Sequence, residues 1–444
     1  MSDPPLNVND PNVNAPEVNT EDANPFNLAE LFVQIDTAYR KSNFGRAEQL
    51  CRIGASHAPG APWWPYFHAL TAHNLGLRQA GLDACAAAHN AIQTGSASQF
   101  ETLLPRLGEL EEALRASTPA AVTRQEPGYL LIKTWGYGFW SDIGHFVSAL
   151  LLAEMTGRIP VIHWGSGCRY SDDPESDAFR TFFEPLNDVT LADIEALDAA
   201  CFPSKWTRAT LRNDRFEQWS GPGGRQSGLY LLNRPEPVVV TDFYTQVFEL
   251  APWLNKDHWL AGASPHEIFS RLYQKYFTLR PEIQADIDAF IQSNFDGGPI
   301  LGVHVRNADK AAENTNFDAD IAQIMPVVDD YLKRDDNLRI FLLTDSAHAV
   351  AAYRDRYGAR VIFTDSERAD GDVGVHVKAT ESRRRLGVEV IKDTYMAAAC
   401  DFFVGLGYSN VPGMVSVLKD WPSENIHLIG ENGLLRENML LHDW

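Results

Sequence analysis

Cysteine is scarce in this sequence, and the few cysteines show no pairing pattern. Only five occur among 444 residues, and none forms a Cys-x-x-Cys pair. Their odd number and wide spacing argue against a disulfide framework or a zinc knot, and favour a reducing compartment. The N-terminus has no basic segment followed by an apolar run, and no stretch of about 18 apolar residues occurs. We therefore expect a cytoplasmic protein without a signal peptide or membrane span.

Positive charge is also scarce. The chain has 38 Lys and Arg residues against 59 Asp and Glu residues, which gives a formal net charge of -21. This imbalance argues against nucleic acid or an anionic membrane as a partner. Any phosphate-binding site must therefore be a local basic pocket in an acidic protein.

The rest of the composition, 45% hydrophobic and 22% charged, is typical of a soluble globular protein. A chain of this length is too long for one ordinary core, so we expect two or three domains. Residues 1–25 are rich in Asn, Pro, Asp and Glu and show no periodic apolar face. We expect this segment to be disordered.

Residues 26–120 show an entirely helical pattern with an internal repeat of 34 residues, the period of tetratricopeptide (TPR) repeats. The matching pairs are Phe32 and Tyr66, Ala38 and Ala72, Tyr39 and His73, Ala47 and Gly81, Leu50 and Ala84, and Cys51 and Cys85. Two repeats are fewer than the three or so that are stable alone, so we expect support from a helix near 98–115 and from the next domain. A plain helical bundle is the alternative.

From Gly128 onward the pattern becomes α/β, with a first half over 121–297 and a second half over 298–444. The first half predicts strands at 129–133, at 158–163 and within 229–240, a helix at 143–155, and helices between 265 and 293. The run Asp296-Gly297-Gly298-Pro299 is a breaker that marks the boundary. The second half predicts strands at 300–305, 338–343, 360–363, 401–404 and 426–429, with helices at 320–334, 346–357, 387–400 and 411–419. Such regular alternation predicts parallel sheets with right-handed crossovers.

The strand at 300–305 ends abruptly in polar residues. These residues are His304, Arg306, Asn307, Asp309 and Lys310. Ligands of open α/β sheets bind at the carboxyl ends of the strands, and the planar fork of an arginine matches the oxygens of a phosphate. The run therefore indicates a phosphate site, with an ordinary charged turn as the alternative.

The same run resembles the His-x-Arg strand of the α1,6-fucosyltransferase and protein O-fucosyltransferase superfamily, which includes the rhizobial nodulation fucosyltransferase. Further segments agree with the superfamily in kind and order over roughly residues 128–430: Gly136-Tyr137-Gly138, Cys168-Arg169-Tyr170, Phe182-Phe183-Glu184-Pro185, Thr344-Asp345, Asp393 and Ser409. The resemblance implies a GT-B fold, in which two Rossmann-like halves face each other across a cleft and the C-terminal half holds most of the nucleotide sugar. The expected fold class is thus α/β, preceded by the helical TPR-like domain.

The resemblance also implies roles for individual residues. His304 would meet the nucleotide and Arg306 the diphosphate, where a cation stabilises the charge that grows as the glycosidic bond breaks. Several relatives have a second arginine where this chain has Asn307, and Lys310 is a candidate replacement charge. Gly136, Tyr137 and Gly138 would allow the ligand to approach the backbone closely.

Two later segments complete the implied donor site. Thr344 and Asp345 would lie beside the nucleotide, although a helix N-cap is the alternative interpretation of this segment. Asp393 would read the base or ribose, and an aspartate can accept hydrogen bonds from guanine N1–H and the exocyclic amine. Ser409, 16 residues later, would bind phosphate at the start of a helix. Asn410 stands where some relatives have Gln.

The general base is the weakest element of the resemblance. Glu313 and Asp309 are the candidates, and an exposed loop glutamate is the alternative for Glu313. We predict no metal and no cofactor, because basic groups and helix dipoles can replace a metal in GT-B enzymes. The Asp-x-Asp triplets at 286–288, 318–320 and 370–372 are expected by chance among 59 acidic residues.

The sequence thus predicts an inverting, metal-independent glycosyltransferase that moves fucose from GDP-fucose to a glycan, a lipid-linked molecule or a protein. The helical module would recruit that acceptor, bind a protein partner or mediate self-association. One alternative is a GT-B transferase that uses another nucleotide sugar. The other is a TPR-type interaction protein with an inactive glycosyltransferase-like domain.

Overall fold

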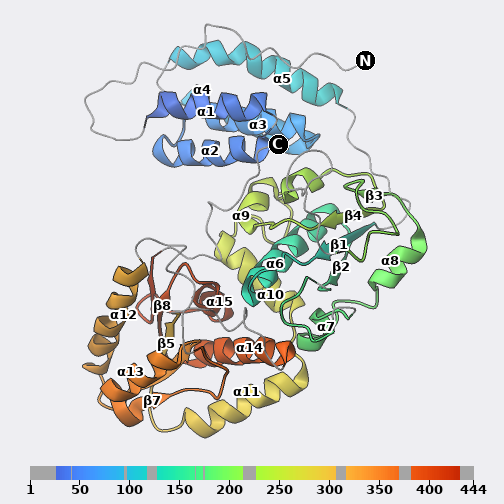
Figure 1. The fold of residues 1–444 in the computed structure, drawn as a ribbon. Coiled ribbons are helices and arrows are strands. Elements are labelled where there is room, and N and C mark those ends of the chain that lie inside the picture. The colour runs from blue at the N-terminus through green and yellow to red at the C-terminus, as the bar shows by residue number, and fades with distance from the viewer. Residues whose placement is uncertain are drawn as a thin grey trace.

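The computed structural model describes residues 27–41, 43–94, 98–117, 128–165, 167–173, 176–213, 227–306, 317–369 and 382–430. The segment predicted to be disordered, 1–25, lies outside these ranges. Figure 1 shows three parts: a layer of helices at the top and two α/β halves below it. None of the described helices combines the length and the apolar character that crossing a lipid bilayer requires.

The N-terminal module is helical, as predicted. Its helices are α1 (Leu28–Arg40), α2 (Phe44–His57), α3 (Trp63–Asn74), α4 (Arg78–Thr94) and α5 (Leu104–Ala116), with a 3-10 turn, η1 (Ser98–Leu103), before the last. Several residues of the 34-residue repeat are buried between these helices, including Ala47, Ala72 and Cys85. The assignment to TPR repeats stays a prediction.

The module lies directly on the first α/β half. The imidazole of His68 stacks on the indole of Trp253 at a centroid distance of 4.1 Å. Asn233 Nδ2 donates hydrogen bonds to the carbonyls of Leu75 and Gly76 at 3.3 and 3.2 Å. Because stacking and hydrogen bonds combine here, the module has a defined orientation relative to the half below it.

The first half is built on a parallel sheet in the order β2-β1-β4-β3. Its strands are β1 (Tyr129–Lys133), β2 (Ile159–His163), β3 (Cys201–Phe202) and β4 (Val238–Thr241). Its helical elements are α6 (Phe139–Thr156), α7 (Phe179–Phe182), α8 (Leu191–Leu197), η2 (Gly228–Leu231), α9 (Val247–Leu250), η3 (Ala251–Trp253), α10 (Pro265–Tyr276) and α11 (Pro281–Asn294). The strand expected within 229–240 begins only after Pro237, because prolines at 235 and 237 cannot donate to a ladder and 228–231 form a 3-10 turn.

The second half is built on a parallel sheet in the order β7-β6-β5-β8-β9. Its strands are β5 (Ile300–Val305), β6 (Arg339–Thr344), β7 (Val361–Ile362), β8 (Phe402–Leu406) and β9 (Ile426–Ile429). Its helical elements are α12 (Phe317–Leu332), α13 (Ala347–Tyr357), η5 (Gly358–Arg360), α14 (Arg383–Ala399) and α15 (Asn410–Leu418). The predicted alternation is confirmed, and with it the α/β class with two Rossmann-like halves.

A glycine in the central strand β5 lets α14 pack closely on the second sheet. A Cβ atom on Gly302 would lie 2.9 Å from the ring of Phe403 and 3.3 Å from Cys400 Sγ. Any larger residue would therefore push the end of α14 away from β5.

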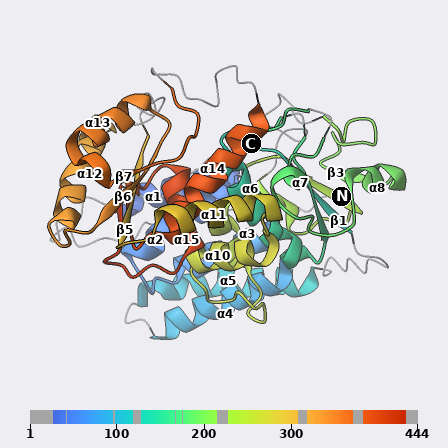
Figure 2. The same ribbon diagram turned by 90° about the horizontal axis from the view of Figure 1, so that it is seen from below.

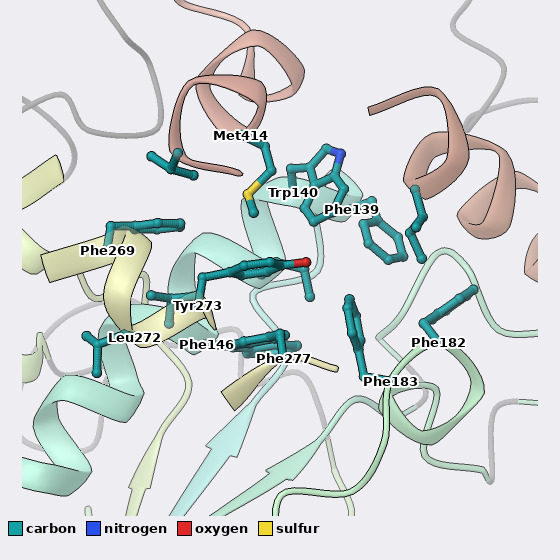
Figure 3. Close-up of a cluster of buried hydrophobic side chains, with 14 of the residues drawn as sticks. Phe139, Trp140, Phe146, Phe182, Phe183, Phe269, Leu272, Tyr273, Phe277 and Met414 are labelled. Atoms are coloured by element: carbon teal, nitrogen blue, oxygen red, sulfur yellow. The ribbon is translucent and has the colours of Figure 1, made fainter. Parts of the chain in front are cut away.

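The apolar interior is continuous between the two halves. One buried cluster includes Leu130 of β1 and Phe403 of β8, and its centre is α6, which is buried from Phe139 to Ala153. Figure 3 shows Trp140 of this helix beside Met414 of α15, with Tyr273 of α10 close by. Viewed from below, α6 and α14 lie between the two sheets (Figure 2).

Candidate active site between the two halves

A pocket lies where the N-terminal end of α6 faces the carboxyl ends of β5 and β6. Both halves contribute residues to its wall, so it has the position that the GT-B resemblance implies for a donor site. The described lining residues are Gly138, Phe139, Trp140, Tyr170, His304, Arg306, Leu343, Thr344, Asp345, Ser366, Glu367, Leu386, Glu389, Val390, Asp393, Thr394, Asn410 and Val411.

Seven residues predicted for the site line this one pocket: Gly138, His304, Arg306, Thr344, Asp345, Asp393 and Asn410. Three others lie beside it without lining it. Gly136 (φ +87°) forms a turn, Tyr137 is 46% exposed, and Ser409 is buried at the start of α15. Asn307, Asp309, Lys310 and Glu313 lie outside the described residues.

The end of β5 places His304 and Arg306 on the same side of the strand, because side chains two residues apart in a strand share a face. His304 is buried, and burial together with the Arg306 guanidinium lowers the pKa of its imidazole to about 3. The ring is therefore neutral at physiological pH. Its Nδ1 atom is buried and has no hydrogen-bond partner among the described residues, so a bound ligand would find a polar atom ready to bond.

The segment at the end of β6 both caps a helix and contributes to the wall of the pocket. Ser346 is the N-cap of α13, where its hydroxyl accepts a hydrogen bond from the Ala349 backbone N–H at 3.3 Å. The cap role thus falls to Ser346, and Thr344 and Asp345 line the pocket.

Asp393 faces the pocket from the middle of α14. Its carboxylate accepts hydrogen bonds from Thr364 Oγ1 at 2.8 Å and from Ser366 Oγ at 3.3 and 3.4 Å. Although one side faces the cleft, burial on the other sides raises the pKa of this carboxyl to about 6, and the two hydroxyls and the nearby Arg368 oppose part of that rise. A carboxylate that is ionised but poorly solvated is well suited to accept N–H groups from a ligand.

The start of α15 adds a polar group for an anion. The side-chain oxygen of Ser409 is fully buried and has no partner within the described part of the chain, although Ser409 occupies the N-cap position. Asn410, the first residue of this nine-residue helix, lines the pocket. The positive end of the helix dipole and Arg306 therefore act on the same space, which favours a phosphate group there.

A buried carboxylate that the sequence analysis did not single out holds the turn at Gly136. Asp142 accepts hydrogen bonds from the Gly136 N–H, Thr134 Oγ1 and Trp164 Nε1 at 2.8, 3.0 and 2.8 Å. Burial raises the pKa of Asp142 to about 6. This carboxylate therefore holds the backbone at Gly136, a residue that does not line the pocket.

Thr364, Ser366, Glu389 and Trp140 were also missed. Thr364 follows β7, so its position at a strand end could have identified it in the same way as Thr344. Glu389 precedes Asp393 by one helical turn, and one of its oxygens accepts from the Glu367 backbone N–H at 2.9 Å. The described residues contain no group of three or more His, Cys, Asp or Glu side chains arranged to hold a metal ion.

Comparison with known proteins supports the assignment of this pocket. Residues 267–414 match the sequence model of the alpha-(1,6)-fucosyltransferase N- and catalytic domains, a segment that contains every lining residue of the second half. The chain is 24% identical over 285 residues to Nodulation protein Z of Sinorhizobium fredii, covering 60% of this chain and 82% of the relative. It is 26% identical over 284 residues to Nodulation protein Z of Bradyrhizobium diazoefficiens, covering 60% and 72%.

Among solved structures, the chain is similar to the crystal structure of NodZ alpha-1,6-fucosyltransferase with GDP. The TM-score is 0.45 at 21% identity, over 66% of this chain and 93% of that one. The sequence matches confirm the predicted resemblance to the fucosyltransferase superfamily and the prediction of a glycosyltransferase.

Proposed function

We propose that this protein, which is similar to members of the fucosyltransferase superfamily, transfers fucose from GDP-fucose to an acceptor, with inversion at the sugar carbon and without a metal ion. The observation that carries the proposal is the convergence of seven residues from five separate sequence segments on one pocket. A chance match at one motif would not bring the others to the same place.

The donor is held by complementary groups. Asp393 accepts the N1–H and the exocyclic amine of guanine, a pair of donors that adenine, uracil and cytosine do not present together. Arg306 and the N-terminus of α15 bind the diphosphate, with the buried Ser409 hydroxyl as an additional donor. His304 is neutral, so it adds a hydrogen bond without adding charge.

The transfer step follows from this placement. As the bond between the sugar carbon and the β-phosphate oxygen breaks, negative charge grows on the departing diphosphate, and Arg306 stabilises it more strongly in the transition state than in the ground state. An acceptor hydroxyl attacks the same carbon from the opposite face, forms the new C–O bond and gives its proton to a base. Glu313 and Asp309, in the segment that follows Arg306, remain our candidates for that base.

We propose that the acceptor binds on the side of the first half, where Gly138 lines the pocket and the exposed Tyr137 lies beside it. A glycan, a lipid-linked molecule and a protein all remain candidate acceptors, and the helical module would recruit the acceptor, bind a partner or mediate self-association. We also propose a cytoplasmic location, since none of the five cysteines forms a disulfide bond.

Calorimetric titration tests the donor. We expect GDP to bind, ADP, UDP and CDP to bind much more weakly, and EDTA to change nothing. Tighter binding of another nucleotide would leave the GT-B assignment intact and would indicate a different donor sugar nucleotide. This is the alternative that Asn307 suggests. Binding of none would favour the inactive interaction protein.

The variant Arg306→Ala tests the catalytic role. We expect it to fold normally and to lose donor turnover by about a hundredfold to a thousandfold, as is typical when one preorganised charge-stabilising group is removed. Arg334→Ala, at an exposed arginine in the turn that follows α12 in the same half, is the matched control. Turnover of Arg306→Ala at the rate of the control would exclude the assigned role.

A further inference from the structure

The helix that carries Asp393 belongs to the second half in sequence, but residues of the first half hold it in place. At its start, the Asp172 carboxylate accepts hydrogen bonds from Ser382 Oγ at 2.9 Å and from the Arg383 backbone N–H at 2.5 Å. One turn later a Cβ atom on Gly387 would lie 2.5 Å from the ring of Phe182, so α14 and α7 are in direct contact. The position of α14 therefore depends on the first half along its length.

The contact nearest the pocket is made by Trp140. This side chain is 2% exposed and lies beside Phe139 and Met414 in the buried cluster (Figure 3). Its indole Nε1–H donates to Thr394 Oγ1 at 2.8 Å, and the Thr394 hydroxyl in turn donates to the Val390 carbonyl at 2.6 Å. Thr394 is fully buried, so no water replaces either bond.

We propose that Trp140 is a positioning residue for nucleotide recognition, which acts through Thr394 to fix the turn of α14 that presents Asp393 to the base. This inference rests on the proposed GDP-sugar function. If the inference is right, Trp140 of the first half affects how selectively Asp393 of the second half recognises the nucleotide base.

The chemistry of the turn explains why a small change would matter. Val390, Asp393 and Thr394 all line the pocket, and Asp393 immediately precedes the residue that Trp140 holds. Without the indole N–H, the buried Thr394 oxygen lacks its donor, and the hydroxyl must rotate or the turn must shift to satisfy it. Two parallel N–H···O bonds to one carboxylate require exact alignment, so a shift at residue 394 weakens the reading of guanine at residue 393.

The test compares GDP with inosine diphosphate (IDP), which lacks only the exocyclic amine of guanine. The variants are Trp140→Phe, Thr394→Val and the double variant, and binding of both nucleotides is measured by calorimetry. Thr394→Val keeps the shape of the side chain and removes the oxygen, so it remains informative if Trp140→Phe folds poorly. Trp421→Phe is the matched control, because its indole N–H donates to the Val415 carbonyl at 2.9 Å and neither of these residues lines the pocket.

We expect the wild type and Trp421→Phe to prefer GDP over IDP to the same degree. In Trp140→Phe and Thr394→Val the preference should fall about fivefold, as is typical for the loss of one buried hydrogen bond. The preference of the double variant for GDP should be no lower than that of either single variant, because both changes remove the same hydrogen bond.

Three other outcomes would contradict the inference, and each would point to a different cause. An unchanged preference in both single variants, even with a lower melting temperature, would show that the bond is only structural. Additive losses in the double variant would show that Trp140 acts on the ligand by direct contact and not through Thr394. A wild type that binds neither nucleotide would remove the proposed function itself, whereas a selective wild type with equally selective variants would remove this inference alone.

Discussion

Protonation of Asp393 should weaken donor binding as the pH falls through about 6. This carboxyl has its pKa raised to about 6 because it is buried, and it must be ionised to accept both N–H groups of guanine. His304, another titratable group that lines the pocket, has a pKa of about 3 and stays neutral over the same range. The pH dependence of binding between 5 and 7 should therefore report on Asp393.

The size of the effect follows from the fraction ionised. With a pKa of about 6, roughly nine tenths of the free protein carries the carboxylate at pH 7 and roughly one tenth at pH 5, so the dissociation constant should rise about tenfold over that range. Asp393→Asn should bind the donor about ten to a hundred times more weakly at pH 7, as is typical when a charged hydrogen-bond acceptor is lost. Its affinity should also no longer depend on pH in this range.

The raised pKa of Asp393 also affects the stability of the protein without ligand, and here ionisation is unfavourable, whereas it favours donor binding. An aspartate with a pKa of 3.8 in the unfolded chain and about 6 in the folded one binds more protons when folded, so its contribution to the free energy of unfolding falls as the pH rises from about 4 to 6. At pH 7 the ionised Asp393 costs the fold about 3 kcal/mol. Asp393→Asn without ligand should accordingly melt at a higher temperature than the wild type, while it binds the donor worse.

The assay should use GDP-fucose without acceptor. A terminal phosphate loses its second proton near pH 6, as in phosphorylated side chains, and free GDP would add its own pH dependence, whereas GDP-fucose is esterified at both ends. Affinity of the wild type that stays constant between pH 5 and 7 would refute the assignment of Asp393. If the affinity of Asp393→Asn also fell tenfold between pH 7 and pH 5, another group would be responsible for the pH dependence. Asp142, whose pKa is raised to about 6, would be the first to examine.

Three further outcomes are expected. Turnover of GDP-fucose should be unchanged by EDTA, and restoration of lost activity by Mg²⁺ or Mn²⁺ would contradict the metal-free proposal. Asp172→Ala should lower the free energy of unfolding, measured by urea denaturation, by about 1 kcal/mol, because the start of α14 loses the carboxylate that accepts from Ser382 Oγ and the Arg383 N–H. Asp420→Ala, at an exposed aspartate, is the control. Trp253→Ala should remove the stack on His68 and lower the free energy of unfolding by about 3 kcal/mol, as truncations of buried aromatic residues do. Backbone amides of the helical module should then exchange hydrogen faster than those of the two α/β halves, and equal protection of all three parts would contradict this prediction.

The second half was predictable because its strands alternate regularly with helices and its central strands β5, β6 and β8 are buried on both faces. β5 and β9 lie where the sequence placed them, and β6 and β8 begin one residue later than predicted. The first half was less predictable, because β3 has only two residues and α7 and α8 are short elements within long connections. Elements of this size have no periodicity to detect.

The residues alone pointed to the site only where polar side chains stand at a strand or helix end, whereas Asp393, in the middle of α14, came from the resemblance. His304, Arg306, Thr344 and Asp345 lie at or just after the carboxyl ends of two neighbouring parallel strands, so their convergence follows from the topology. Trp140 could not be found in this way, because it meets Thr394 across 254 residues of sequence. Tyr137, predicted to bind the donor, lies outside the pocket wall because Asp142 holds the preceding turn in another direction.

The uninterrupted apolar interior between the halves bears on how such enzymes can be recombined. Leu130, Tyr273 and Met414, from three distant parts of the gene, pack in the same cluster. A chimera that joins the acceptor half of one relative to the donor half of another at 297–298 would cut through close-packed surfaces shaped for each other. To keep its stability, such a chimera would need α6 and α10 from the same parent as α14 and α15, so exchange of acceptor specificity is better attempted through loops than through whole domains.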